Sequence, residues 1–247
     1  MKIISLNIWG GGVGKEKILN FFRENEEVDI FCLQEVWSGG SEDPKLKEGL
    51  TTDVNHNVLD DIDEVLKDHR YFFRPRLGDH YGLAIFVKNN IDVIEEGEVW
   101  VHKEKGYVPK DHVGRHAINL QYIIIGKENK TTIYNFHGLW NGQGKGDSDD
   151  RLLQSDKITE FVKDTKNPFV LTGDFNLLPE TESIKRIEEL GVSNLITQYN
   201  IKSTRTSLYN KDVPFADYMF VSKDIDVKKF KMMDDEVSDH MAMCLEF

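Results

Sequence analysis

Residues 169–176 read Phe-Val-Leu-Thr-Gly-Asp-Phe-Asn, an apolar run that gives way to a glycine and two polar side chains. The run predicts a buried strand over 168–173. Asp174 and Asn176 follow directly after this strand. Because strand ends on a rigid scaffold hold side chains in fixed positions, these two residues are candidates for chemistry.

Polar residues stand at the ends of other predicted strands in the same way. The strands expected over 2–7, 28–34 and 131–137 end in polar residues, and the strands at 216–221 and 241–247 begin with them or follow them. These polar residues are Asn7, Gln34, Glu35, Asn135, His137, Asp217, Asp239 and His240. We therefore expect distant parts of the chain to contribute side chains to one site.

The rest of the pattern predicts the fold class. Apolar residues at helical spacing indicate helices over 15–25, 58–68, 150–164 and 181–190, and further strands are expected near 70–75, 82–88, 91–101, 116–125 and 225–231. Most strands come in adjacent runs, which favours two packed sheets with helices outside over a doubly wound parallel sheet. No proline-rich or serine-rich linker divides the chain, so residues 1–247 are expected to form a single domain.

Length and composition are those of a globular protein. The 247 residues are 39% hydrophobic and 30% charged, and Lys+Arg 31 against Asp+Glu 43 gives a net charge of −12. An acidic protein repels the phosphate backbone, which argues against binding nucleic acid by bulk charge. A bound divalent cation would reverse the charge locally, so one phosphate substrate site remains compatible with this composition.

Two features bear on the location of the protein. No apolar run approaches the roughly 18 residues that span a bilayer, and the first apolar segment is too short for the core of a signal peptide. Cys32 and Cys244 each lie in an apolar run, which is typical of buried free thiols in a reducing compartment. The sequence therefore predicts a cytoplasmic protein, which we expect to be a monomer.

The candidate residues at the strand ends carry only a few kinds of functional group. They supply carboxylates, carboxamides and imidazoles, and no serine or cysteine nucleophile stands against a His–Asp pair in a recognisable elbow. Hard oxygen donors with few thiolates favour Mg²⁺ or Mn²⁺ over Zn²⁺. A histidine paired with an aspartate can position a water or stabilise developing charge. Together these residues suit metal-assisted hydrolysis of a phosphate ester by water.

Simpler interpretations exist for individual residues and motifs. Asn7 or Asp174 alone would be a turn former, and His137 alone a satisfied core histidine. The glycine-rich stretch 9–15 fails the spacing of a phosphate-binding loop, so a turn before a helix is expected there. The acidic loop 147–150 predicts a helix N-cap, with a second metal site as the alternative.

Several short motifs, in order along nearly the whole chain, carry a resemblance to a known family. They are Leu6-Asn7, Leu33-Gln34-Glu35, Tyr81-Gly82-Leu83-Ala84-Ile85-Phe86, Arg115, Asn135-Phe136-His137, Gly173-Asp174-Phe175-Asn176, Asp217-Tyr218-Met219-Phe220-Val221-Ser222 and Ser238-Asp239-His240. With these motifs the sequence resembles the endonuclease/exonuclease/phosphatase family, the fold group of exonuclease III and pancreatic-type deoxyribonuclease. The resemblance implies an α+β fold, a four-layer α/β/β/α sandwich of two mostly antiparallel sheets flanked by helices.

The resemblance also implies how the metal and the attacking water are held. Glu35 would be a direct ligand of the divalent ion, with Asn7 and Asp239 beside the same ion. Asp174 would orient or deprotonate the attacking water. Asn176 would bind a non-bridging phosphate oxygen.

Further roles concern the substrate. His240 would hydrogen-bond the scissile phosphate, and Asp217 would fix the tautomer of this histidine and raise its basicity. His137 and Arg115 match positions that contact phosphate in the deoxyribonuclease branch, and His137 would protonate the leaving group. Tyr81 is a further candidate for substrate contact.

The phosphoester itself is less closely defined by the motifs. The residues after Asp217 lack the arginine of the inositol-polyphosphate 5-phosphatases, and Phe175 stands where the tyrosyl-DNA phosphodiesterases have threonine. The stretches 7–10 and 33–38 look somewhat like the sphingomyelinase branch. We expect a Mg²⁺-dependent phosphodiesterase that acts on nucleic acid, with hydrolysis of a small phosphoester or lipid headgroup as the alternative. A non-catalytic binding module on the same scaffold is the third hypothesis.

Overall fold

Two mixed sheets of six strands each form the centre of the protein in the computed structural model, which describes residues 1–39, 54–107 and 116–247. The strands are β1 (Lys2–Asn7), β2 (Ile30–Trp37), β3 (His69–Leu77), β4 (Tyr81–Lys88), β5 (Val93–His102), β6 (Ile118–Ile125), β7 (Thr131–His137), β8 (Phe169–Asp174), β9 (Ser193–Asn194), β10 (Asp217–Val221), β11 (Lys229–Met232) and β12 (Met243–Glu246). The helices are the 3-10 helix η1 (Trp9–Gly11), α1 (Lys15–Glu24), α3 (Val58–Val65), α4 (Asp149–Val162), α5 (Glu182–Glu188) and α6 (Leu195–Gln198).

The two sheets share one plan. Sheet one has the strand order β11-β12-β1-β2-β4-β3, and sheet two has the order β5-β6-β7-β8-β10-β9. Each sheet holds one parallel pair at its centre, β1 with β2 and β7 with β8, and its other neighbours are antiparallel. In both cases the connection between the parallel strands contains a helix, α1 or α4, as a parallel connection requires.

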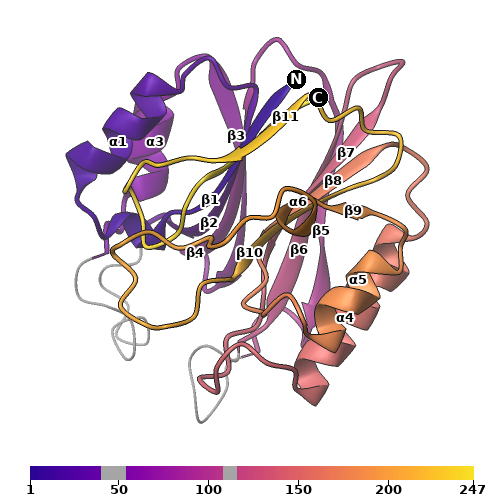
Figure 1. Ribbon diagram of the computed structural model, residues 1–247. Coiled ribbons are helices and arrows are strands. Elements are labelled where there is room, and N and C mark those ends of the chain that lie inside the picture. Colours follow the sequence, from indigo (N-terminus) through magenta and orange to yellow (C-terminus); the bar gives the residue numbers. More distant parts are fainter. Residues whose placement is uncertain (40–53, 108–115) are drawn as a thin grey trace.

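The sheets pack face to face and the helices cover their outer faces (Figure 1). β1 and β2 of sheet one lie against β7 and β8 of sheet two. Helices α1 and α3 lie together over sheet one, while α4 and α5 lie together over sheet two. The expected four-layer α/β/β/α sandwich with mostly antiparallel sheets is confirmed.

Alternation along the central strands explains why both faces of a sheet are covered. In β1, Ile3 belongs to the core between the sheets, whereas Ile4 and Leu6 pack beneath the helices on the outer face. The same alternation occurs in β2, where Cys32 is directed into the core between the sheets and Phe31 into the outer core. Because successive side chains of a strand point to opposite faces, a strand that is apolar at every position requires a packing partner on each side.

Some element boundaries differ from the expected ones. The second strand does not end at residue 34 but continues to Trp37, so Glu35 lies inside β2. The strand expected over 225–231 is the shorter β11, and the short elements β9 and α6 were not predicted. The turn expected in the glycine-rich stretch 9–15 contains η1, and most of the loop expected over 38–55 lies outside the described residues.

The acidic loop before α4 acts as a pair of helix caps. The hydroxyl of Ser148 accepts a hydrogen bond from the Arg151 N–H at 3.4 Å, which makes it the N-cap of α4. The carboxylate of Asp147 accepts from the N–H groups of Glu182 and Ser183 at the start of α5. The N-cap prediction for this loop is thus confirmed for Ser148, and Asp147 stabilises the neighbouring helix instead.

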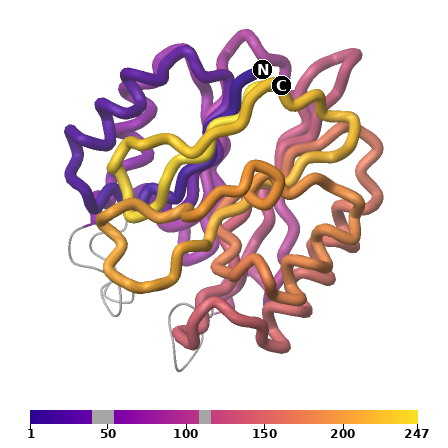
Figure 2. The backbone as a smooth tube through the Cα atoms, in the orientation of Figure 1, coloured from indigo at the N-terminus to yellow at the C-terminus, as the bar shows by residue number. Residues whose placement is uncertain are grey.

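The chain ends in the sheet where it begins. β12 pairs with β1 in antiparallel register, so the last strand returns beside the first, as the yellow and indigo ends of the tube show (Figure 2). The thiols of Cys32 and Cys244 are both buried and free, as expected.

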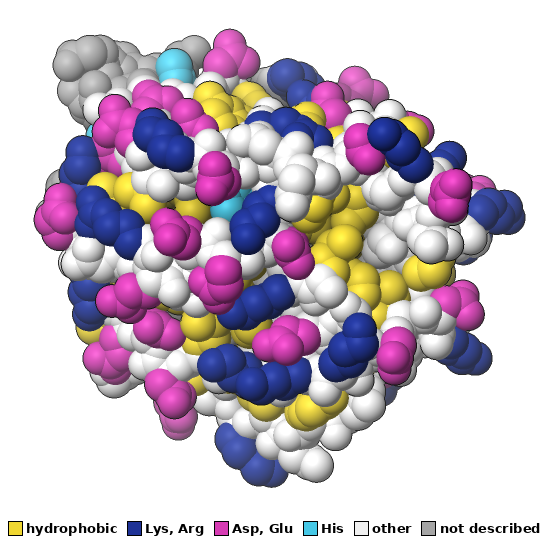
Figure 3. Space-filling model, turned by 90° about the horizontal axis from the view of Figure 1, so that it is seen from above, with side chains coloured by type: hydrophobic (Ala, Val, Ile, Leu, Met, Phe, Trp, Pro, Cys, Tyr) yellow, Lys and Arg dark blue, Asp and Glu magenta, His cyan; other side chains and the backbone are white. Residues whose placement is uncertain are grey.

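Charged side chains of both signs are interspersed over the face on which the termini lie (Figure 3). None of the helices within the described ranges combines the length and the apolar character needed to cross a membrane.

Candidate active site

The two parallel strand pairs end at the same place in the sandwich. Asn7 ends β1 and pairs in register with Gln34 of β2, one residue before Glu35. His137 ends β7 and pairs in register with Asp174 at the end of β8. Because β1 and β2 lie against β7 and β8, the carboxyl ends of four strands from two sheets bring these side chains together. The carboxyl ends of parallel strands are a common place for active sites.

Three residues of this region have a left-handed backbone conformation, which sets the direction of their side chains. Glu35 has φ 58° and lies where the pairing of β2 with β4 shifts between Leu33 and Val36. Trp9, with φ 49°, and Asn176, with φ 55°, lie two residues after the strand ends at Asn7 and Asp174. Such backbone is costly for residues other than glycine and clusters at functional sites, and a bulge re-aims the side chain that it carries.

Asn7 links the carboxylates of the two sheets. Its Nδ2 group donates to Glu35 Oε1 and to Asp174 Oδ2, each at 3.0 Å. Its Oδ1 accepts a hydrogen bond from the Trp9 N–H at 3.0 Å, so the carboxamide orientation is fixed from both ends. Asn7 therefore holds the two carboxylates beside each other.

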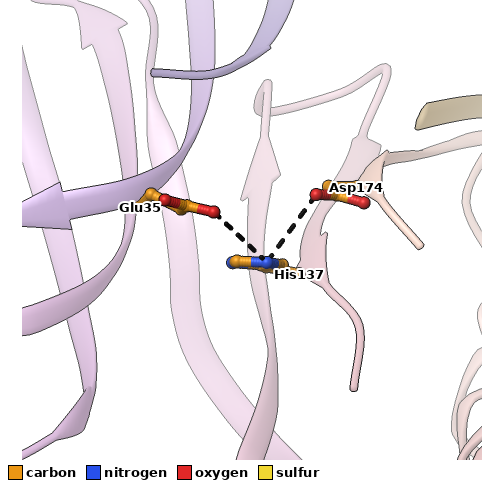
Figure 4. A group of neighbouring side chains, drawn as sticks. All are labelled: Glu35, His137 and Asp174. Atoms are coloured by element: carbon orange, nitrogen blue, oxygen red, sulfur yellow. Dashed lines mark ion pairs between the residues drawn. The ribbon is translucent and has the colours of Figure 1, made fainter. Parts of the chain in front are cut away.

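His137 completes one half of the cluster (Figure 4). Its Nε2 lies 3.8 Å from Glu35 Oε1 and 3.7 Å from Asp174 Oδ2. On the other side of the ring, Arg76 Nη2 donates to Nδ1 at 2.9 Å and Arg76 Nη1 donates to the His137 carbonyl at 2.7 Å. Burial and the charge of Arg76 hold the pKa of His137 well below its ordinary value. The ring is therefore neutral with its proton on Nε2, directed at the carboxylates.

His240 and Asp217 form the other half. His240 Nδ1 donates to Asp217 at 2.8 Å, and Asp217 also accepts a hydrogen bond from the Thr204 hydroxyl at 2.8 Å. Nε2 of His240 lies 3.6 Å from Asp174 and 3.7 Å from Asp239. Burial lowers the pKa of His240, but the negative charges of Asp217 and Asp174 and the hydrogen bond to Asp217 together outweigh this effect and raise the pKa above its ordinary value. The pair thus favours an imidazolium.

The two central carboxyl groups have opposite pKa shifts. Burial alone would raise the pKa of Asp174, but the surrounding positive charges of His240 and Lys145 hold it well below the usual range. Burial raises the pKa of Glu35, and the hydrogen bond from Asn7 only partly offsets this effect. Asp174 is therefore a stable anion, while Glu35 gains from the approach of a further positive charge.

The donor set fits a divalent cation. Two groups, Glu35–His137–Asp174 and Asp174–Asp217–His240, each place three ligand atoms within 4.8 Å of one another, and Asp174 belongs to both. Carboxylate oxygens dominate these groups and both cysteines are remote in the buried cores, which is the ligand chemistry of a hard cation such as Mg²⁺ or Mn²⁺.

The structure brings most of the expected site residues to this one place. Asn176 lies beside Asp174, whose Oδ1 accepts its backbone N–H at 2.8 Å. Tyr81 is buried nearby, with the guanidinium of Arg76 5.3 Å from its ring centroid. Arg115 lies outside the described residues.

Two other polar residues near strand ends do not belong to the site. Gln34 and Asn135 instead hydrogen-bond to each other between the sheets at 2.8 Å.

Three cationic residues of the site were missed in the sequence. Arg76 contacts His137, Arg205 Nη1 forms an ion pair with Asp239 Oδ2 at 3.0 Å, and Lys145 lies near the carboxylates from the loop before α4. For Lys145 a signal existed, because a lysine between Gly144 and Gly146 in an otherwise polar loop invites a functional interpretation. Neither arginine belongs to a motif that sequence reasoning could single out.

Comparisons with known proteins agree with the fold. The model of the Endonuclease/Exonuclease/phosphatase family matches residues 4–240. A comparison of the sequence with curated proteins found no match.

Solved structures of the same fold are similar over their whole length. A family protein from Bacteroides thetaiotaomicron has a TM-score of 0.75 and 18% identity, covering 99% of this chain and 96% of its own. A mannosyl-6-phosphatase from the same species has a TM-score of 0.72 and 19% identity, covering 100% and 98%. A functionally unknown conserved protein from Enterococcus faecalis has a TM-score of 0.76 and 18% identity, also covering 100% and 98%. With the family match spanning nearly all residues, the chain belongs to the endonuclease/exonuclease/phosphatase family.

Proposed function

We propose that this protein hydrolyses phosphoester bonds by attack of water on phosphorus, with the help of a bound Mg²⁺ or Mn²⁺. Members of its family are phosphoester hydrolases. The observation that carries the proposal is the position of Asp174, which lies within 3.7 Å of His137 on one side and 3.6 Å of His240 on the other. A permanent anion between two imidazoles and a second carboxylate suits both the positioning of water and the holding of a cation.

In this proposal the cation is held by Glu35, with Asp239 on the other side of the site and Asn7 keeping Glu35 beside Asp174. A divalent cation bound there would stabilise the negative charge that develops on the phosphate and leaving oxygens. Asn7 presents its NH₂ group to the carboxylates, so its role would be to position Glu35 and Asp174 rather than to ligate through its oxygen.

The remaining side chains would carry the proton and the phosphate. Asp174 would orient the attacking water and accept its proton. His240, held as an imidazolium by Asp217, would donate a hydrogen bond to a phosphate oxygen. Asn176 would bind a second phosphate oxygen. His137, which is neutral with its proton on Nε2, would donate a hydrogen bond to the leaving oxygen, and water would supply the proton that this oxygen takes up.

Two substrate classes follow from the sequence. A phosphodiesterase that acts on nucleic acid is the first, and a hydrolase of a small phosphoester or lipid headgroup is the second. The net charge of −12 favours the second class, because a polymer with one negative charge per phosphate needs an extended basic surface. The cytoplasmic location, the monomeric state and the single domain expected from the sequence stay predictions.

The test is an activity panel in the presence of Mg²⁺ or Mn²⁺. Single-stranded DNA, duplex DNA, RNA, sphingomyelin, a hexose phosphate and aryl phosphoesters would be compared. We expect turnover of at least one ester, loss of turnover with excess EDTA, and restoration by Mg²⁺ or Mn²⁺ rather than by Zn²⁺. Absence of turnover on every substrate over a range of metal concentrations would contradict the proposal.

Asp174→Asn and Asp224→Asn form a matched pair for this test. Asp174 lies in the cluster, whereas Asp224 is an exposed aspartate outside it. We expect the first substitution to abolish turnover and to weaken Mn²⁺ binding measured by electron paramagnetic resonance, and the second to change neither. Equal Mn²⁺ binding by both variants would exclude Asp174 from the metal site.

A further inference from the structure

Lys145 is held beside the catalytic cluster by the fold of its own loop. The buried guanidinium of Arg151 donates to the carbonyls of Gly146 at 2.5 Å and Gly144 at 2.9 Å, on the two sides of Lys145. The Lys145 carbonyl itself accepts a hydrogen bond from the Leu178 N–H at 2.9 Å. The backbone at Lys145 is therefore fixed on both sides, so its position is a built feature of the fold.

The ammonium group of Lys145 is buried but lacks a hydrogen-bonding partner within the described part of the chain. The residue is 4% exposed, and its buried Nζ forms no hydrogen bond with any of the described residues. Burial lowers the pKa of this group to about 8, although the carboxylates of Asp174 and Asp217 act in the opposite direction. A buried cation without a hydrogen-bonding partner is costly, and a ligand that supplies the missing acceptor would relieve this cost.

Arg205 lies on the same side of the site. Its guanidinium stacks over the ring of Tyr209 at 4.1 Å from the centroid, and Lys145 Nζ lies 5.9 Å from the same centroid. Nη1 of Arg205 binds Asp239, while its buried Nε has no hydrogen-bond partner among the described residues. Two cations thus share one aromatic ring, and both keep N–H groups without acceptors.

We propose that Lys145, supported by Arg205, binds the third non-bridging oxygen of a terminal phosphate, so that the enzyme selects phosphomonoesters over phosphodiesters. This proposal rests on the proposed phosphoester hydrolysis. A terminal phosphate has three non-bridging oxygens and a diester has two. Asn176 and His240 account for two of them, and Lys145 supplies the donor for the third.

The charges around the site point the same way. Arg76, Lys145 and Arg205 bring positive charge beside the carboxylates of the site, and a bound divalent cation would add two further positive charges. A dianionic phosphomonoester gains more from this positive charge than a monoanionic diester does. The side chain of Glu35, 27% exposed, gives the cluster access to solvent.

The kinetic test compares Lys145→Met with Lys145→Arg on two aryl esters in Mn²⁺. For Lys145→Met we expect kcat/KM to fall about 10- to 100-fold on p-nitrophenyl phosphate and less than about 3-fold on bis(p-nitrophenyl) phosphate, as loss of one charged hydrogen bond to a single oxygen requires. Lys145→Arg should recover part of the monoester activity. Lys166→Met, at an exposed lysine, is the matched control and should change neither rate. Equal losses on both esters would overturn the proposal.

A binding measurement separates this proposal from the proposed function. Inorganic phosphate and dimethyl phosphate would be titrated calorimetrically into the metal-loaded protein. Lys145→Met should weaken the binding of phosphate about 10-fold or more and leave dimethyl phosphate unchanged. If the wild type binds phosphate in this way but hydrolyses no ester, the proposed function fails and the phosphate site stands. If phosphate binding does not depend on Lys145, the phosphate site fails.

Stability distinguishes a ligand-binding lysine from a structural one. Since Lys145 is buried without a hydrogen-bonding partner, its replacement by methionine should leave the melting temperature unchanged or raise it. A lower melting temperature that Lys145→Arg restores without restoring phosphate binding would assign the residue to folding instead. Phosphate release from a hexose 6-phosphate and from a 5′-phosphorylated oligonucleotide then tells the two sources of a terminal phosphate apart.

Discussion

Asp174 connects the two halves of the candidate active site. It is the carboxylate shared by both potential metal-binding groups, it accepts the amide of Asn7, and its other oxygen accepts the N–H of Asn176. The positive charges of His240, Lys145 and Arg205 keep it ionised despite its burial. A carboxylate that is always ionised can accept a hydrogen bond from water and orient it without first losing a proton, which fits a reaction that begins with water.

Substitution of Glu35 is expected to raise the metal requirement, whereas substitution of His240 is expected to lower kcat. Glu35→Gln removes a charge next to Asn7 and Asp174, so the metal concentration for half-maximal activity should rise about 10-fold or more. His240→Gln removes the ring that Asp217 orients, so kcat should fall about 10²- to 10⁴-fold at saturating metal. Steady-state kinetics at several Mn²⁺ concentrations measure both quantities.

The division of roles between these two residues can be contradicted directly. The same increase in the metal requirement for both variants would place His240 at the cation. The same decrease in kcat, with no change in metal requirement, would remove Glu35 from the ligands. Circular dichroism spectra of both variants would serve as the control for folding.

At the scale of single residues, the sequence predicted which side chains meet but not all of their surroundings. Asp174 and His240 could be named because they stand beside strands in a recognisable order. Arg76 could not, since the strand that carries it is polar on its exposed face and shows an arginine at position 70 and another at 74 as well. From the sequence, Gln34 and Glu35 were equally good candidates for the site. The bulge in β2 directs Glu35 into the site and leaves Gln34 between the sheets.

Among the secondary-structure elements, β7 and β8 set the distance between His137 and Asp174. They approach so closely at Gly173 that a Cβ built there would lie 1.9 Å from the carbonyl oxygen of Phe136. The backbone of Gly173 also has φ +141°, which side chains rarely tolerate. The glycine in Gly173-Asp174 is thus required for the parallel pairing that places Asp174.

Gly173→Ala should therefore destabilise the protein and displace Asp174. We expect the free energy of unfolding, measured by urea denaturation, to fall by about 2–4 kcal/mol, and the remaining folded protein to lose activity. Gly146→Ala is the matched control, since a Cβ there meets no atom within 4 Å and the cost should stay within about 0.5 kcal/mol. Similar losses in both variants would show that the contact with Phe136 does not matter.

Elements with strong periodicity could be predicted, and elements without it could not. The central strands are apolar at most positions, and α1 buries Ile18 and Phe22 on one face, so each has a clear signal. β9 is two residues long and α6 is four, too short for any period to show. β11 could be placed only roughly, because its single buried residue is Phe230 and pairing with β12 decides its limits.

On the scale of the whole molecule, two similar halves meet at the candidate active site. Each half contributes a parallel strand pair joined through a helix, and the site lies where the carboxyl ends of both pairs face each other. Neither sheet alone carries the set, because Glu35 and Asn7 come from sheet one and His137, Asp174 and Asp217 come from sheet two. The function therefore depends on how the sheets are aligned as much as on either sheet.

A buried polar network fixes this alignment. Asn135 of β7 lies 3.0 Å from the Leu33 carbonyl and 3.2 Å from the Ala84 carbonyl in the opposite sheet. It also accepts from Gln34 Nε2 at 2.8 Å and lies 3.1 Å from Gln121 Oε1. Sheet surfaces held only by apolar contacts can slide, whereas hydrogen bonds between them select one register.

Asn135→Ala should accordingly affect the whole molecule. It leaves Gln34, Gln121 and two backbone carbonyls without their partner in a buried layer, so we expect urea denaturation to show a loss of about 3–5 kcal/mol in the free energy of unfolding. Asn129→Ala, at an exposed asparagine before the same strand, should cost less than about 0.5 kcal/mol. A loss below about 1 kcal/mol for Asn135→Ala would mean that apolar packing alone aligns the sheets.

The same variant should also affect the metal requirement. Because Glu35 follows Gln34 directly, Asn135→Ala should need more Mn²⁺ for half-maximal activity. An unchanged metal requirement would show that the geometry of the site does not depend on the alignment of the sheets.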